Sequence, residues 1–139
     1  MSSPEPCLAS HTMTSGRVPR DSERPSAAHG VARLITGRKG QLSTPAASLL
    51  IRKHQAAGGF LLTASHNPGG PDGDFGIKFN TRTGGQAPES LSESIYAASR
   101  EVHEYRIADL PELDLSTTGA IELEGFKVEV LDSTSDYAD

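Results

Sequence analysis

The sequence has one cysteine and no tryptophan among its 139 residues, and aromatic residues make up only 5% of it. The single cysteine, Cys7, cannot form a disulfide within the chain, and this usage is typical of a reducing compartment. No apolar run approaches the roughly 20 residues that a membrane helix needs, and the opening residues lack an unbroken hydrophobic signal region. We therefore predict a soluble, cytoplasmic protein with no membrane span.

Clustered basic charge is also missing. The chain has 13 Lys and Arg against 18 Asp and Glu, a net charge of −5. Proteins that bind nucleic acid neutralise its phosphates with grouped Lys and Arg, so we expect no nucleic-acid partner. The five histidines show no H-x-x-x-H spacing, which argues against a zinc site.

The length predicts one domain at most. Residues 1–29 are rich in Ser, Pro, Arg and Glu and show no apolar period of 2 or 3.6. Such a segment buries too little apolar surface to offset the entropy lost on ordering. We predict a disordered leader over 1–29 and a folded domain over 30–139.

The first half of that domain has the pattern of a strand, a helix and a second strand. The apolar segment 32–37 predicts a buried strand, and a helix begins after it with Ser43 or Thr44 as N-cap. The glycine pair that starts at Gly58 is expected to end the helix. The segment 60–64 predicts a strand that is apolar on both faces, as in parallel sheets covered by helices. Loops at the carboxyl ends of such strands bind ligands.

The second half continues with alternating patterns. In GIKFN, Ile77 and Phe79 share one face and Lys78 the other, so Lys78 is expected to point away from the core. The segment 88–105 predicts a helix with an apolar stripe, and 126–132 predicts a strand. The fold class that we predict is α/β, a layered α/β/α domain with a mixed sheet.

The loop TASHNPGGPDGDFG, which starts at Thr63, contains the strongest functional signal. Ser65 follows a buried strand, and a serine hydroxyl reacts only beside a base, a positive environment or a metal. Glycines clear side chains from the loop, so that backbone N–H groups can converge on an anion. Asn67 offers a further donor. We interpret the loop as a phosphate site whose serine carries a phosphoryl group.

Two other interpretations of the loop are open. A serine hydrolase would need a G-x-S-x-G elbow, which is absent, and strand alternation would direct His66 away from Ser65. Alternatively, Ser65 only caps a turn and the glycines only form bends. Asp72 and Asp74 could suggest Mg²⁺ ligands, but no further carboxylates follow, and we interpret them as solvated turn residues.

The sequence TASHNPGGPDGDFGIKFN resembles the active-serine loop of the α-D-phosphohexomutase superfamily, whose signature is T-A-S-H-N-P. GRKGQLSTPAASLLIRKHQAAGG before it resembles the helix that the family enters through a Ser-Thr-Pro turn. NTRTGGQAPESLSESIY after it resembles the Gly-Gly-x-Ala-Pro-Glu helix start. The resemblance covers about residues 30 to 137, and PGGPDGDFGIKFN favours the phosphoglucomutase branch over phosphomannomutases and phosphoglucosamine mutases.

The resemblance implies roles for individual residues. Ser65 falls on the serine that is phosphorylated and donates its phosphoryl group to a sugar hydroxyl. Thr63, His66 and Asn67 fall on loop residues of the substrate site, and Lys78 falls on a general base or phosphate contact. A Mg²⁺ ion would bind an oxygen of the phosphate on Ser65.

The reaction that the resemblance implies interconverts glucose 1-phosphate and glucose 6-phosphate through a phosphoserine and glucose 1,6-bisphosphate. The enzyme would be an isomerase of carbohydrate metabolism with phosphosugars as its partners, and we expect a monomer. The family's enzymes have four domains, and this chain matches only the first. We therefore predict a partial first domain that lacks the other Mg²⁺ ligands and is inactive alone.

The start of the chain departs from the family. Thr14–Arg17 resembles a T-S-G-x-R segment, but the family places a strand, a helix and another strand between that segment and the region matching 32–37. A chance match is one interpretation, and a deleted block is the other. A non-catalytic scaffold or binding member of the family is the alternative function that we carry forward.

Overall fold

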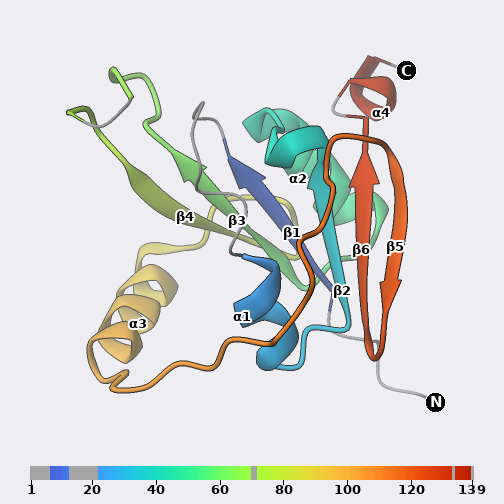
Figure 1. Ribbon diagram of the computed structural model, residues 1–139. Coiled ribbons are helices and arrows are strands. Elements are labelled where there is room, and N and C mark those ends of the chain that lie inside the picture. The colour runs from blue at the N-terminus through green and yellow to red at the C-terminus, as the bar shows by residue number, and fades with distance from the viewer. Residues whose placement is uncertain (1–6, 13–21, 70–71, 133, 139) are drawn as a thin grey trace.

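The computed structural model describes residues 7–12, 22–69, 72–132 and 134–138. It has one six-stranded mixed sheet in the order β4-β3-β1-β2-β6-β5 (Figure 1). The strands are β1 (Cys7–Thr12), β2 (Arg33–Gly37), β3 (Gly58–Thr63), β4 (Gly76–Thr81), β5 (Gly119–Leu123) and β6 (Phe126–Leu131). The helices are α1 (Glu23–Ala28), α2 (Thr44–Lys53), α3 (Glu89–Arg100) and α4 (Ser135–Ala138), with a 3₁₀ turn η2 (Arg38–Gly40).

The four central strands run parallel, and the two edge strands run antiparallel to their neighbours. β1 pairs with both β2 and β3, and β2 pairs with β6. β4 and β5 close the two edges against β3 and β6. The parallel strands β1, β2, β3 and β6 therefore end on the same side of the sheet, which is where ligands bind in this architecture. The predicted α/β class with a mixed sheet is confirmed.

Helix α2 covers one face of the sheet. The Ser43 hydroxyl caps it by accepting a hydrogen bond from the Ala46 N–H at 3.2 Å. Its apolar side packs with two strands in a buried cluster: Ile35, Leu42, Ala46, Ala47, Leu50, Ile51, Ala56 and Leu61. The predicted end of this helix was wrong. The helix stops at Lys53, because Gln55 turns the chain with a φ of +52°, and Gly58 begins β3 instead.

The other face is covered over β2 and β6 by α1 and the segment 106–115. Their apolar residues pack on Leu34, Phe126, Val128 and Val130. The Ala108 N–H donates to the Arg24 carbonyl at 3.1 Å, which ties the segment to α1. Leu34 and Ile35 belong to different clusters because successive strand residues point to opposite faces.

Two elements lie in the stretch that was predicted as a disordered leader. Residues 7–12 form β1 in the centre of the sheet, and residues 23–28 form α1. The prediction does not hold for these residues, because pairing with β2 and β3 orders residues 7–12 and packing against the Leu34 cluster orders residues 23–28. The Thr14–Arg17 match lies outside the described residues.

The alternation predicted for β4 is present, but the sides are reversed. Lys78 lies opposite the buried Leu61 and Ile77 opposite Leu62, so Lys78 shares the face that α2 covers. Lys78 is half-buried, whereas Ile77 is 66% exposed. The reason is that no described helix covers β3 and β4 on the Ile77 side. For the same reason Phe60 of β3 is exposed, although both faces of this strand were predicted to be covered.

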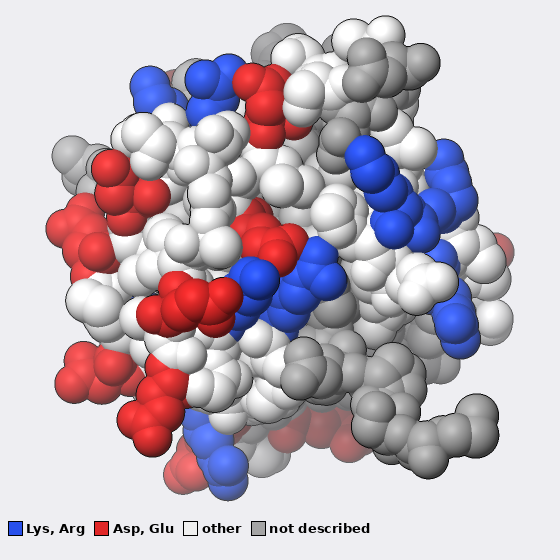
Figure 2. All heavy atoms as spheres, turned by 90° about the vertical axis from the view of Figure 1, so that its right-hand side faces the viewer, with Lys and Arg blue, Asp and Glu red and all other residues white. Residues whose placement is uncertain are grey.

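A network of charged side chains joins β2, β5 and β6. Arg33 donates to Glu129 at 2.7 Å, and Lys127 contacts both Glu129 at 2.9 Å and Glu122 at 3.4 Å. Figure 2 looks onto this side of the molecule and shows acidic and basic side chains in contact near its centre. Burial raises the pKa of Glu129, but hydrogen bonds and charge from Lys127 and Arg33 outweigh it, so the net pKa is lowered.

We predict that Glu129→Gln lowers the free energy of unfolding at neutral pH by about 1 kcal/mol. A carboxylate with a lowered folded-state pKa stabilises the fold above its unfolded value, about 4.3, and loses this contribution as pH falls through the folded value. The difference between wild type and variant should therefore shrink in acid. Urea unfolding at pH 7 and pH 3 measures it. Glu124→Gln, in the exposed β5–β6 turn, is the matched control.

Candidate functional site

Ser65 lies two residues beyond the end of β3, at the carboxyl side of the parallel strands. Its φ is +58°, a left-handed conformation that a residue with a side chain adopts at an energetic cost of about 1 kcal/mol or more. The Ser65 N–H donates to the Thr63 hydroxyl at 2.9 Å, and Thr63 is itself buried. The chain thus turns sharply as the strand ends, and Ser65 is exposed. Strained, exposed residues of this kind cluster at functional sites.

The loop after Ser65 is closed by its own hydrogen bonds. The Asn67 side-chain amide donates to the Asp74 carboxylate, and the Asp74 N–H donates to the Pro68 carbonyl at 3.0 Å. The Asn67 N–H donates to the Ala64 carbonyl at 3.2 Å. The N–H groups of Asn67 and Asp74 are therefore engaged within the loop. Asn67 was predicted to donate a hydrogen bond to an anion. In this structure the anion that accepts from it is the Asp74 carboxylate.

Gly73 is required by the close approach of two parts of this loop. A Cβ atom at Gly73 would lie 2.3 Å from the Pro68 carbonyl oxygen, far inside van der Waals contact. By contrast, a Cβ atom at Gly76 would meet only the Thr63 carbonyl oxygen, at 3.5 Å. Gly73 in the loop and Gly76 at the start of β4 therefore differ sharply in the space around them.

We predict that Gly73→Ala opens the loop without unfolding the domain. The added methyl group displaces Pro68, so exchange of the Asp74 amide should speed up by about tenfold or more, while core amides of β2 and β6 keep their protection. Hydrogen exchange read by NMR measures both. Gly76→Ala is the matched control and should leave the Asp74 amide unchanged. Unchanged exchange in Gly73→Ala would contradict the predicted contact.

The other predicted site residues are placed less closely together. His66 is exposed beside Ser65. Lys78 lies on β4, with its Cα opposite Leu61, four residues before Ser65 on the neighbouring strand. Within the described residues, no hydrogen bond or ion pair joins Lys78 to the serine loop. Ser65, His66 and Asn67 thus share one loop, and Lys78 lies on the strand that leaves it.

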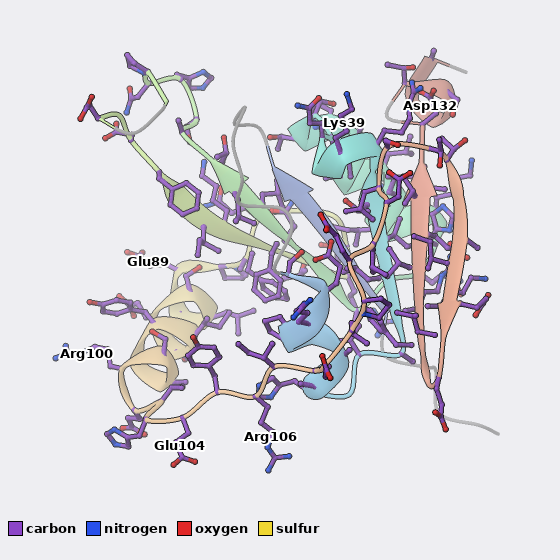
Figure 3. All side chains as sticks on the ribbon, viewed as in Figure 1. Lys39, Glu89, Arg100, Glu104, Arg106 and Asp132 are labelled. Carbon is purple, nitrogen blue, oxygen red and sulfur yellow. The ribbon has the colours of Figure 1, made fainter. Side chains whose placement is uncertain are left out.

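Sequence reasoning missed a second set of charges at the same side of the sheet. Arg38, which follows β2, forms an ion pair at 2.9 Å with Asp132, which follows β6. Hydrogen bonds from Thr134, together with Arg38, lower the pKa of Asp132. The next residue, Lys39, is exposed with a φ of +56°, and its N–H donates to the Leu115 carbonyl at 2.7 Å. Figure 3 shows Lys39 and Asp132 at the upper end of the sheet. The sequence signal was the pair of glycines around Arg38 and Lys39.

The described residues do not by themselves fit a Mg²⁺ site. No group of three or more His, Cys, Asp or Glu side chains that could hold a metal occurs in the ranges that the structure describes. Of the two loop aspartates, Asp74 is hydrogen-bonded to Asn67. The Ser65 oxygen, or a phosphate on it, would supply a single ligand. We therefore derive no step through Mg²⁺ from this chain.

Comparisons with known proteins agree on one family. Residues 15–106 match the family described as phosphoglucomutase/phosphomannomutase, alpha/beta/alpha domain I. A phosphoglucomutase of Emericella nidulans is 56% identical over 111 residues, which cover 80% of this chain and 20% of that protein. A chloroplastic phosphoglucomutase of Brassica napus is 48% identical over 112 residues, which cover 81% of this chain and 18% of that protein.

A solved structure extends the similarity to the fold. The exocytosis-sensitive phosphoprotein pp63/parafusin, a phosphoglucomutase from Paramecium in its open form, matches with a TM-score of 0.85 and 36% identity. The match covers 97% of this chain and 27% of that one. This chain spans about a fifth of the length of its curated relatives. In the described part of the chain, no helix combines the length and apolar character that a membrane crossing requires.

Proposed function

Since the chain belongs to the phosphoglucomutase/phosphomannomutase family, through its domain I, we propose that it carries the phosphorylated serine of a phosphoglucomutase. The full enzyme would interconvert glucose 1-phosphate and glucose 6-phosphate. Identity of 56% and 48% to proteins named phosphoglucomutase supports the glucose branch over phosphomannomutase.

The conformation of Ser65 is the observation that carries this proposal. Ser65 combines a φ of +58° with an exposed position at the carboxyl side of the sheet, and strained, exposed residues of this kind cluster at functional sites. The strain is compensated by its N–H bond to Thr63. Thr63 thereby acts as a positioning residue, since its hydroxyl accepts the hydrogen bond from the Ser65 N–H.

The proposed chemistry is a phosphoryl transfer in two steps. In the first, a sugar hydroxyl attacks the phosphorus on Ser65; the bond from phosphorus to Ser65 Oγ breaks and a bond to the sugar oxygen forms. The proton of the sugar hydroxyl passes to a base, the departing Ser65 Oγ takes up a proton, and glucose 1,6-bisphosphate results. In the second, Ser65 Oγ attacks the other phosphate and its hydroxyl proton passes to a base; the bond from that phosphorus to the sugar oxygen breaks, the sugar oxygen takes up a proton, and Ser65 regains a phosphoryl group. Lys78 is assigned as the base or as a phosphate contact, and His66 and Asn67 as contacts to the transferred group.

Asn67 gives the loop a way to respond to the phosphate. Its amide donates to Asp74 in the present structure, so the same amide can reach a phosphate oxygen only after that bond breaks. A phosphate on Ser65 would compete with the Asp74 carboxylate, because both are anionic acceptors. The Asp74 carboxylate therefore accepts the Asn67 hydrogen bond until a phosphate on Ser65 takes its place.

The remaining assignments follow from this proposal. The partners are phosphosugars, the oligomeric state is monomeric, and neither nucleic acid nor membrane is a partner. The cytoplasmic placement stays a prediction, because some relatives are named as chloroplastic. Mg²⁺ bound through the phosphate on Ser65 would need its other ligands from outside the described residues.

The test uses a chimera in which residues 58–81 of this chain replace the aligned segment of the Emericella nidulans enzyme. After incubation with glucose 1,6-bisphosphate, peptide mapping by mass spectrometry should find one phosphoryl group, on Ser65. The chimera with Ser65→Ala should carry none. An unmodified Ser65 in an otherwise folded chimera would overturn the proposal.

A further inference from the structure

Asp74 is fixed inside the serine loop through both its backbone and its side chain. Its N–H donates to the Pro68 carbonyl at 3.0 Å, and its carboxylate accepts a hydrogen bond from the Asn67 side-chain amide. The residue before it is Gly73, where a Cβ atom would lie only 2.3 Å from the Pro68 carbonyl oxygen. The end of the loop therefore lies against its start, and the Asp74 carboxylate is held beside Asn67, which is two residues after Ser65.

The chemistry of the two side chains fixes the direction of this hydrogen bond. A carboxylate only accepts hydrogen bonds, so the nitrogen of the Asn67 amide, and not its oxygen, faces Asp74. A hydrogen bond to a charged acceptor is roughly twice as strong as one between neutral groups. Asp74 thus decides where the Asn67 donor points in the loop of this structure.

Asp72 lies two residues earlier in the same loop and makes no such bond. Both aspartates are exposed and have the same side chain. Within the described residues, however, the Asp72 side chain has no hydrogen bond or ion pair, whereas that of Asp74 has Asn67 as its partner. The loop thus contains a matched pair of carboxylates, of which only Asp74 can act through Asn67.

The bond between Asn67 and Asp74 belongs to one state of Ser65. The proposed function gives the phosphate on Ser65 a contact to Asn67, and the Asn67 donor is then withdrawn from Asp74. The bond therefore stabilises the loop while Ser65 is a free hydroxyl, and it contributes nothing once the phosphoryl group is present. An interaction that is made in only one of two states shifts the equilibrium toward that state.

We propose that Asp74 sets how fully Ser65 is phosphorylated. By holding Asn67 it favours the unphosphorylated loop, and so it favours passage of the phosphoryl group from Ser65 to the sugar. In that exchange the phosphoryl group moves from Ser65 Oγ to a sugar oxygen, a proton moves the other way, and glucose 6-phosphate becomes glucose 1,6-bisphosphate. Asp74 acts through Asn67 and is therefore a positioning residue. The proposal rests on the proposed function, because it requires a phosphoryl group on Ser65.

The test uses the chimera that carries residues 58–81 of this chain, equilibrated with glucose 1,6-bisphosphate and glucose 6-phosphate at a fixed ratio. Peptide mapping by mass spectrometry after an acid quench gives the ratio of phosphorylated to unphosphorylated Ser65. In Asp74→Asn, which keeps the shape of the side chain and removes its charge, this ratio should rise about fivefold. Asp72→Asn, the matched control, removes the same charge from the same loop and should leave the ratio within about twofold.

The variant Asn67→Ala separates the hydrogen bond from the charge. In that background the bond to Asp74 is already absent, so adding Asp74→Asn should change the ratio by less than about twofold. Both aspartates and Asn67 are exposed, so thermal unfolding should show that all these variants keep the fold of the chimera.

The possible outcomes distinguish this proposal from the proposed function. An unchanged ratio in Asp74→Asn, with Ser65 phosphorylated as in the parent chimera, would overturn this proposal and leave the proposed function standing. A rise of the same size in Asp72→Asn, or in Asp74→Asn on the Asn67→Ala background, would assign the effect to loop charge alone and overturn it too. If Ser65 carried no phosphate in any variant, the proposed function would fail, and this proposal with it.

Discussion

In the chimera that carries residues 58–81 of this chain, Ser65→Ala is expected to lower kcat for glucose 1-phosphate by about 10⁴-fold or more. The reason is that the proposed mechanism has no other oxygen on which the phosphoryl group can rest between its two transfers. A coupled assay for glucose 6-phosphate formation measures it. KM should change much less, since the sugar contacts that set substrate affinity stay in place.

Ser65→Gly is the control that separates chemistry from conformation. Glycine adopts a positive φ readily, so this variant removes the hydroxyl while relieving the backbone strain seen at Ser65. It should be as inactive as Ser65→Ala. If Ser65→Gly kept more than about 1% of the chimera's activity, the serine would be acting through loop shape, and the assignment of Ser65 as phosphoryl carrier would fail.

The isolated 139-residue chain is expected to turn over substrate at least about 10⁵-fold more slowly than the chimera. Stabilising a transferring phosphoryl group requires donors and positive charge on several sides of it. The described residues supply one serine loop, whose Asn67 is paired with Asp74, and Lys78 on an adjoining strand. The same coupled assay, run at high protein concentration, measures it.

Contaminating mutase is the main source of error in that assay, and Ser65→Ala in the isolated chain controls for it. Residual activity that is equal in both preparations belongs to a contaminant and agrees with the prediction. Glucose 6-phosphate formation that is reduced to background by Ser65→Ala would contradict it. Such a result would mean that this domain alone surrounds the phosphate well enough for catalysis.

The parts of the fold that were predicted correctly are those whose signal is local. Ser43 was one of two expected N-caps because hydroxyl side chains at that position satisfy free N–H groups of the first turn, and its hydroxyl accepts from Ala46. The serine loop was predicted because Gly and Pro exclude a helix there. The alternation of Ile77 and Lys78 was also correct, since strand geometry fixes it.

The errors concern information that a local pattern does not contain. Alternation tells which residues share a face, but only the placement of α2 decides which face is buried, and so the sides of β4 were reversed. The residues of β1 lack an apolar pattern of their own and become a strand through pairing with β2 and β3. The left-handed turn at Ser65 was not predicted, because serine rarely adopts it and no local rule demands it.

The pairing of β2 with β6 has a consequence for how the chain folds. Arg33 lies opposite Lys127, so this ladder joins segments from opposite ends of the domain. Contacts of such high sequence separation form slowly, because a long loop must close, with a loss of chain entropy, before any hydrogen bond of the ladder can form. During synthesis the free edge of β2 has no β6 to pair with, although β1 and β3 already exist. The nascent domain therefore passes through a state with an exposed parallel edge, and unpaired strand edges of this kind are prone to aggregation.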